Sequence, residues 1–201
     1  MIPDDERWNH NIHYHRVIHA ALPHPCRSVL DVGCGEGVLT RQLRRRAVEV
    51  LGIDLDEQSI QLAREQSPTA DIRYVVGDVL THPFEDAPFG AVVSVATLHH
   101  LDAEAGLRRM AELVAPGGTL AVVGLARSRL PHDVHWELAA VVAHRAQRLL
   151  HRYWEHSAPM VWPPPLTYGQ MQSLATALLP GARFRRHALW RYPIVWRKPL
   201  H

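Results

Sequence analysis

The chain has 201 residues, 47% of them hydrophobic, and a net charge of +2 with histidine counted as neutral. This length and composition suit one domain with a single core, and the near-neutral charge argues against a nucleic-acid partner, which usually requires a clustered basic face. We expect no membrane partner and no secretory leader, because we find neither an apolar span of about 20 residues nor a basic, apolar N-terminus. Only two cysteines occur, Cys26 and Cys34, which excludes a disulfide scaffold and favours a cytoplasmic protein.

The first predicted element is a helix over residues 7–22. Ile12, His15, Ile18 and Leu22 fall near one side of this helix and give it a partly apolar face. A face of this kind packs against the body of a domain.

A glycine-rich turn follows the first predicted strand. Residues 29–32 are a short apolar run that contains Asp31, and Gly33, Gly35 and Gly37 then occupy alternate positions before a helical pattern. Glycine is needed where the backbone adopts a positive φ or approaches a ligand closely. In an open α/β sheet, such a turn between strand and helix usually forms the mouth of a nucleotide-type pocket.

Four further strands are predicted along the next part of the chain. They cover residues 48–53, 72–76, 91–95 and 119–123. The first of them ends in Asp54, about 20 positions beyond the glycine turn, where a carboxylate is typical of ribose binding. The second runs into Asp78, and the third is followed by His99 and His100. Polar side chains therefore stand at successive strand ends.

The chain departs from this alternating plan after the strand over 119–123. Residues 132–153 predict one long helix that is rich in histidine, and three consecutive prolines then exclude helical structure just before residue 166. Thr167 and Gln170 predict a capping box that opens a helix through Leu178. Strands near 182–189 and 192–197 follow.

This succession resembles the class I S-adenosylmethionine-dependent methyltransferases of the small-molecule type. The resemblance covers roughly residues 28–125, where the motifs Asp-x-Gly-x-Gly-x-Gly, Gly-Ile-Asp, Gly-Asp and Pro-Gly-Gly follow one another in that family's order. It implies an α/β fold with a Rossmann-like, seven-stranded, mostly parallel sheet, helices on both faces and an α-helical insertion after strand five. Lys198 is the only lysine among 22 basic residues, which indicates a GC-rich bacterial genome.

The same resemblance divides a single domain of residues 1–201 into four parts. Residues 1–27 form a helical lid over the cofactor or, equally, a helix packed on the edge of the sheet. Residues 28–125 form the cofactor-binding core, residues 126–166 an insertion on the acceptor side, and residues 167–201 the closing helix and β-hairpin.

The resemblance also assigns roles to individual residues around S-adenosylmethionine. The glycines admit its methionyl part, Asp31 lies near its ammonium, Asp54 accepts from its ribose hydroxyls, and Asp78 accepts from its adenine amine. The structural alternative for each acid is a carboxylate that caps a turn. The expected cofactor-binding residues are Asp31, Gly33, Gly35, Gly37, Asp54, Leu55, Asp78, Val79, Ala96 and His15.

Two other readings of the glycine turn stay open. A nicotinamide-dependent oxidoreductase also needs an acid after its second strand, but it spaces its glycines G-x-G-x-x-G, and here the third glycine comes one residue early. A regulator that binds S-adenosylmethionine without catalysis is the other alternative.

The end of the fourth strand bears on the atom that is methylated. It reads Ser94-Val95-Ala96-Thr97 and lacks the Asn/Asp-Pro-Pro-aromatic run of enzymes that methylate exocyclic or amide nitrogens, which favours O-methylation of a sugar, polyketide or phenolic hydroxyl. Histidine is the natural base for a hydroxyl, and the candidates are His99, His144 and His156. A magnesium ion is conceivable, but no metal-ligand motif supports it. We expect a small-molecule acceptor and a monomer or homodimer.

Overall fold

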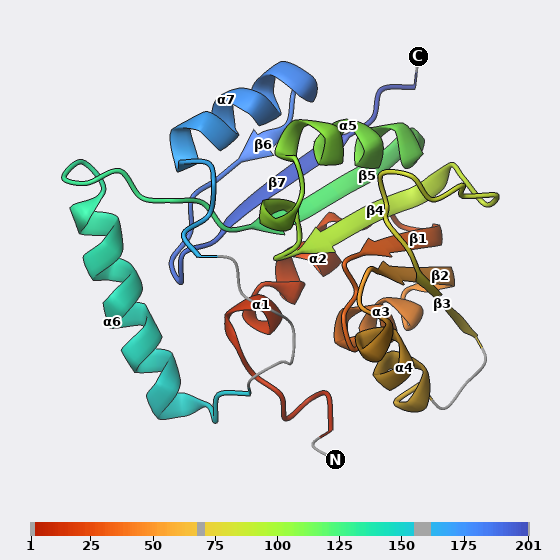
Figure 1. Ribbon diagram of the computed structural model, residues 1–201, viewed down its shortest axis with the longest axis horizontal. Coiled ribbons are helices and arrows are strands. Elements are labelled where there is room, and N and C mark those ends of the chain that lie inside the picture. Colours follow the sequence, from red (N-terminus) through yellow and green to blue (C-terminus); the bar gives the residue numbers. More distant parts are fainter. Residues whose placement is uncertain (1–2, 68–70, 155–161, 201) are drawn as a thin grey trace.

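The computed structural model describes residues 3–67, 71–154 and 162–200, with a β-sheet at its centre (Figure 1). The strands are β1 (Cys26–Val32), β2 (Ala47–Asp54), β3 (Ile72–Val76), β4 (Phe89–Val95), β5 (Val114–Gly124), β6 (Arg183–Phe184) and β7 (Tyr192–Arg197). The helices are α1 (His10–His13), α2 (His15–Ala21), α3 (Val38–Arg44), α4 (Glu57–Glu65), the 3-10 helix η1 (Leu98–His100), α5 (Ala103–Leu113), α6 (Val134–Leu150) and α7 (Tyr168–Leu178).

The seven strands lie in the order β3-β2-β1-β4-β5-β7-β6. The first five in this order pair in parallel, and β7 runs antiparallel to both β5 and β6. The predicted seven-stranded, mostly parallel sheet is therefore confirmed. The chain leaves β1 toward β2 on one side and returns to β4 on the other, and ligands bind at the carboxyl ends of the strands beside such a reversal.

Helices cover both faces of the sheet (Figure 1). On one face, α5 and α7 pack over a core that includes Leu30 and Val92. On the opposite face, α2 and α3 pack over Val29 and Val93. Successive side chains of a strand point to opposite faces, so a strand buried on both sides is mostly apolar, as β4 is. Its one buried hydroxyl, that of Ser94, donates to the Val32 carbonyl (2.9 Å).

Two helices begin at residues whose side chains cap them, and one of these starts, that of α7, is predicted from the sequence. The Asp56 carboxylate accepts the backbone N–H of Ser59 (3.0 Å) at the start of α4. Thr167 and Gln170 cap α7 reciprocally, as the sequence predicts. Each cap satisfies N–H groups that the first turn of a helix leaves without partners.

The structure differs from the single helix predicted over residues 7–22. Helices α1 and α2 meet at Tyr14, and α1 begins only at His10. It begins there because Asn9 Oδ1 accepts the N–H groups of Asn11 and Ile12, both at 2.9 Å. The side chain of Asn9 thus replaces the preceding helical turn.

The strand predicted near residues 182–189 is also shorter in the structure, since β6 holds only Arg183 and Phe184. Beyond it, Leu189 and Trp190 have φ angles of 57° and 56°, in the left-handed region that no strand adopts. The side chain of Arg186 contacts Asp133 (2.8 Å), which precedes α6.

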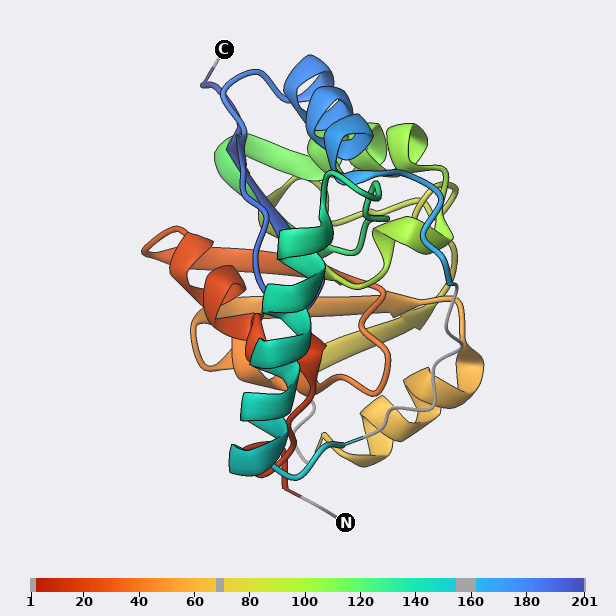
Figure 2. The ribbon, with the colours of Figure 1, turned by 90° about the vertical axis from the view of Figure 1, so that its left-hand side faces the viewer.

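Helix α6 is the predicted insertion helix, slightly shorter than residues 132–153. It stands beside the sheet instead of lying on either face, and Figure 2 shows it alongside α1. Among its described residues only Ala140 is buried. No helix in the described part of the chain is long and apolar enough to cross a membrane.

Candidate active site

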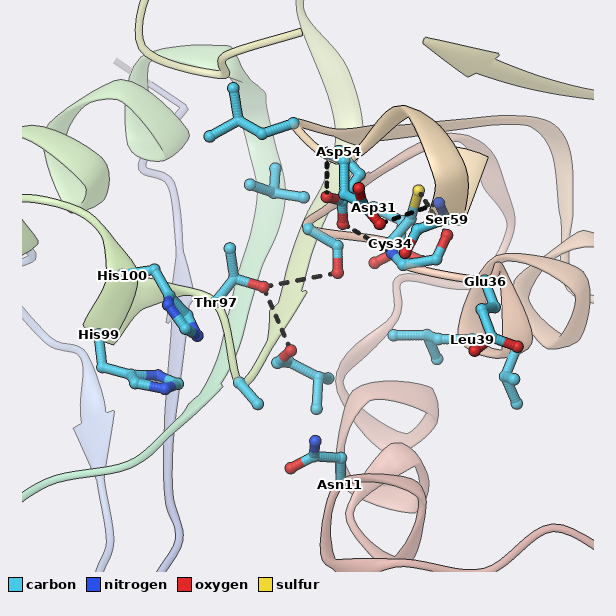
Figure 3. A pocket seen from close by; sticks show the side chains of 18 of the residues that line it. Asn11, Asp31, Cys34, Glu36, Leu39, Asp54, Ser59, Thr97, His99 and His100 are labelled. Carbon is cyan, nitrogen blue, oxygen red and sulfur yellow. Dashed lines mark hydrogen bonds between the residues drawn. The ribbon is translucent and has the colours of Figure 1, made fainter. Parts of the chain in front are cut away.

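A cavity of about 360 Å³ lies at the carboxyl ends of β1, β2 and β4. Figure 3 shows Asp31 and Asp54 on one side of this pocket, His99 and His100 on the other, and Thr97 between them. The two sides come from segments on either side of the topological reversal, where an open α/β sheet is expected to hold its ligand.

The glycine turn forms one wall of the cavity, and the backbone at Gly33 and Gly35 has the positive φ that favours glycine. Gly33 has φ +70°, and a Cβ on it would lie 2.0 Å from Thr97 Oγ1. Gly35 has φ +51°, and a Cβ on it would meet no atom within 4 Å. Glycine at 35 therefore leaves open space in which a ligand can approach the backbone.

Asp54 stands at the end of β2 with both carboxylate oxygens oriented by backbone donors. Oδ2 accepts the N–H of Gly35 (2.8 Å), and Oδ1 accepts the N–H of Asp56 (3.0 Å). Each carboxylate oxygen has a second acceptor site. The fixed carboxylate can thus still accept from a diol such as a ribose.

Asp31 lies deeper than Asp54, with only 1% of its surface exposed. Its Oδ2 accepts from the Thr40 hydroxyl (2.7 Å), which lowers its pKa, but burial dominates and raises the pKa from 3.8 to about 7. The carboxylate has no described cationic partner, so a ligand ammonium above it would be electrostatically favourable.

The end of β3 supplies the edge of the cavity that suits an aromatic base. Asp78 Oδ1 accepts the N–H of Leu80 (2.9 Å), and the neighbouring Val79 is buried. Leu55 is 64% exposed although it borders the cavity. An exposed apolar side chain beside a carboxylate matches the expected cover of an adenine ring.

The segment after β4 forms the wall of the cavity next to Gly33. Ala96 adopts φ 57°, which is strained for a residue with a side chain, and its N–H donates to the Val123 carbonyl (2.7 Å). Thr97 Oγ1 donates to the Val95 carbonyl at 3.3 Å. This turn directs the following η1 helix, which carries His99, toward the cavity.

His99 and His15 border the cavity from opposite walls and are both buried. Burial lowers the pKa of each imidazole from 6.5 to about 4, so both are neutral at pH 7. His15 Nδ1 donates to Gln42 Oε1 (3.0 Å), whereas His99 Nδ1 is buried without a hydrogen-bond partner. A buried nitrogen without a partner destabilises the ligand-free protein, because it has lost its hydrogen bonds to water.

The structure does not bring the candidate base His144 to this cavity. His144 on α6 lies outside its lining, and its Nδ1 is 2.8 Å from His10 Nε2. The contact joins α6 to α1, which gives His144 a structural role. His156 lies outside the described residues.

Three further residues line the cavity with polar or aromatic groups, and the sequence does not assign them to it. They are Asn11, Trp154 and Arg191. The sequence gives no role to Asn11 or Arg191, because an isolated asparagine and an arginine beside a strand carry no local signal.

Within the described ranges, no three His, Cys, Asp or Glu side chains converge to hold a metal ion. The acids that line the cavity come from β1, β2 and the segments that follow β1, β2 and β3, and they accept from backbone, hydroxyl or amide donors.

Comparison with known proteins accounts for this arrangement. Residues 30–122 match the family model described as a methyltransferase domain. An uncharacterized methyltransferase of Mycobacterium tuberculosis is 42% identical over 197 residues, which cover 98% of this chain and 100% of that protein. The chain belongs to the class I S-adenosylmethionine-dependent methyltransferases.

Further relatives of this methyltransferase match only part of it. An O-methyltransferase of Penicillium expansum is 33% identical over 48% of this chain and 37% of that protein.

Among solved structures, the complex between the Haloferax volcanii Trm112 methyltransferase activator and the putative methyltransferase contains a chain that is similar in fold. Its TM-score is 0.65 at 20% identity, covering 94% of this chain and 90% of that chain. A TehB-like methyltransferase of Corynebacterium glutamicum gives a TM-score of 0.58 at 20% identity over 92% of this chain and 86% of that chain. Both structures support the fold.

Proposed function

We propose that this methyltransferase transfers the methyl group of S-adenosylmethionine to a hydroxyl of a small, polyhydroxylated or phenolic acceptor. The observation that supports the proposal most strongly is that the glycine turn, the strand-end acids and His99 line the same cavity, with Thr97 between the acids and His99 (Figure 3). When bound, S-adenosylmethionine supplies an electrophilic methyl group on a sulfonium.

The cofactor side of the cavity fits the four parts of this molecule. Gly35 leaves room for the methionyl chain, and Asp31 offers a negative charge to its ammonium. Asp54 accepts from the ribose hydroxyls, while Asp78 and Leu55 hold and cover the adenine. Each contact uses a group that the fold already orients.

The acceptor side holds the hydroxyl that is methylated. Neutral His99, which lines the cavity, accepts a hydrogen bond from that hydroxyl, orients its oxygen and takes up its proton as the oxygen is methylated. A methyl displacement depends chiefly on alignment and on the exclusion of water. Trp154 and Ile12 also border the cavity and give it apolar surface that helps to exclude water.

Two observations support O-methylation over N-methylation. The end of β4 lacks the motif of enzymes that methylate exocyclic nitrogens, and the partly matching relative from Penicillium expansum is an O-methyltransferase. The histidine-rich and aromatic surroundings suit a sugar, polyketide or phenolic acceptor.

The test is a screen of hydroxylated acceptors with methyl-labelled S-adenosylmethionine. We expect a labelled product that survives mild alkali, because a methyl ether resists the hydrolysis that cleaves a methyl ester. An alkali-labile product would show that a carboxyl oxygen is the nucleophile, and a methylated amine would overturn O-methylation.

A further inference from the structure

Arg191 is a buried cation on the acceptor side of the cavity, with 7% of its surface exposed. Its Nε and Nη2 donate to Asn11 Oδ1 over 3.1 and 2.7 Å, and its Nη1 donates to the Leu189 carbonyl (3.1 Å). Burial lowers its pKa from 12.5 to about 10, so the guanidinium is still charged at pH 7.

The charge of Arg191 has no carboxylate partner within residues 3–67, 71–154 and 162–200. The side chains whose charges act on it are the phenols of Tyr168, Tyr153 and Tyr14, and none of them is a carboxylate. A buried cation without a counterion is costly. A bound anion next to Arg191 would therefore be electrostatically favourable.

Other deeply placed arginines of the chain are neutralised. Arg7 lies 3.4 Å from Asp4, Arg41 lies 2.6 Å from the same carboxylate, and Arg186 lies 2.8 Å from Asp133. Their side chains are 4%, 12% and 12% exposed. Arg191 thus differs from these three arginines, because no carboxylate of the described residues pairs with it.

The distribution of charge in the cavity points the same way. The acids that line the cavity come from β1, β2 and the segments after β1, β2 and β3, which form the side proposed to bind the cofactor. They are Asp31, Glu36, Asp54, Asp56 and Asp78. The acceptor side holds Arg191, the amide of Asn11 and His99, and the charge of Arg191 is close enough to lower the pKa of His99. One side of the cavity suits a cation and the other an anion.

We propose that Arg191 binds an anionic group of the methyl acceptor, a carboxylate or a phosphate, beside the hydroxyl that is methylated. This assignment rests on the proposed function for its biological meaning, but anion binding can be measured without turnover. The bonds of Arg191 to Asn11, Leu189 and Trp190 occupy most of the five guanidinium N–H groups, and an N–H of Nη2 remains to donate to either anion.

A structural role is the competing explanation, because Arg191 also holds the carbonyl of Leu189 in a turn with positive φ. The two explanations differ at Asn11. An Asn11→Asp variant places a carboxylate of the same shape where Asn11 Oδ1 already accepts from Arg191, so it supplies an internal counterion and leaves the turn intact.

The experiment titrates acetate, inorganic phosphate and neutral acetamide into the isotope-labelled protein saturated with S-adenosylhomocysteine, with binding followed by NMR. We expect at least one anion to bind saturably and acetamide not to bind. Acetate alone would assign a carboxylate, and phosphate alone a phosphate. Arg191→Gln should weaken anion binding by about tenfold or more, without changing the affinity for S-adenosylhomocysteine.

Asn11→Asp keeps the proposal falsifiable if Arg191→Gln does not fold. It should abolish anion binding and raise the thermal unfolding temperature. Asn9→Asp is the matched control, since it adds the same charge to the same segment but its side chain caps α1 and does not contact Arg191. Binding of neither anion, or equal anion binding by the wild type and Asn11→Asp, would overturn the proposal.

Discussion

The backbone N–H of Gly35 donates to the Asp54 carboxylate over 2.8 Å. This hydrogen bond joins the glycine turn after β1 to the end of β2, so that two motifs separate in sequence form one rigid wall. The side chain at 54 therefore orients the turn as well as offering an acceptor to a ligand. Its substitution should affect cofactor binding through both roles.

Asp54→Ala should weaken the binding of S-adenosylmethionine by about 2–3 kcal/mol, because hydrogen bonds to a carboxylate contribute this much in a dry site. Titration calorimetry measures the change, and circular dichroism checks the fold. Asp86→Ala removes a half-exposed carboxylate that pairs with Arg73 away from the cavity, and it should leave the affinity unchanged. Unaltered binding by a folded Asp54→Ala protein would refute the role of Asp54.

Asp31 should make the ligand-free protein less stable as the pH rises. Burial raises its folded pKa to about 7, above the 3.8 of the unfolded chain, so between these values the folded state holds a proton that the unfolded state has lost. Its contribution to the free energy of unfolding is full below about pH 4 and is lost as the pH rises through about 7.

Denaturant titrations of the wild type and Asp31→Asn over this pH range test that expectation. The asparagine variant cannot ionise, so it should gain stability relative to the wild type by a few kcal/mol between pH 4 and pH 8. Asp71→Asn, at an exposed position paired with Arg44, serves as the control. A constant difference between wild type and Asp31→Asn would show that the Asp31 pKa is not raised.

His99 should give an unusual pH profile of kcat/KM. Because burial lowers its pKa to about 4, the neutral imidazole persists well below pH 6, and the profile should stay level down to about pH 5.5. His99→Gln should lower kcat by about tenfold or more, with little change in cofactor affinity. An inflection between pH 6 and 7 that disappears in His99→Gln would contradict the low pKa.

The contact between His10 and His144 should hold α6 without serving catalysis. His144→Ala removes the 2.8 Å hydrogen bond that links α6 to α1, so α6 should become more sensitive to proteolysis. Cofactor affinity and kcat should change by less than about threefold, since the side chain lies outside the cavity. A loss of turnover as large as that of His99→Gln would restore His144 as a candidate base.

The part of the site that the sequence predicts is the part built from local signals. The glycines, Asp54 and Asp78 follow apolar strands at short, regular spacings, and parallel strands bring their carboxyl ends to one edge. The fold can be predicted from the same kind of signal, because each strand and each helix cap is encoded within a few residues. The glycine turn and the strand-end acids accordingly surround one cavity.

The acceptor side could not be predicted in the same way, because its contacts join distant parts of the chain. Asn11 and Arg191 are separated by 180 positions, and His10 and His144 by 134. The apolar and histidine-rich pattern of residues 134–150 predicts a helix but contains nothing that specifies where the helix docks. Burial, which moves the pKa of His99 from 6.5 to about 4, is likewise a property of the folded chain alone.

A crystal structure of the protein with S-adenosylhomocysteine tests the central claim most directly. The account predicts that the ribose hydroxyls bind the Asp54 carboxylate and that the sulfur faces the space between His99 and Arg191. A ribose bound away from Asp54, or a sulfur turned away from that space, would contradict it.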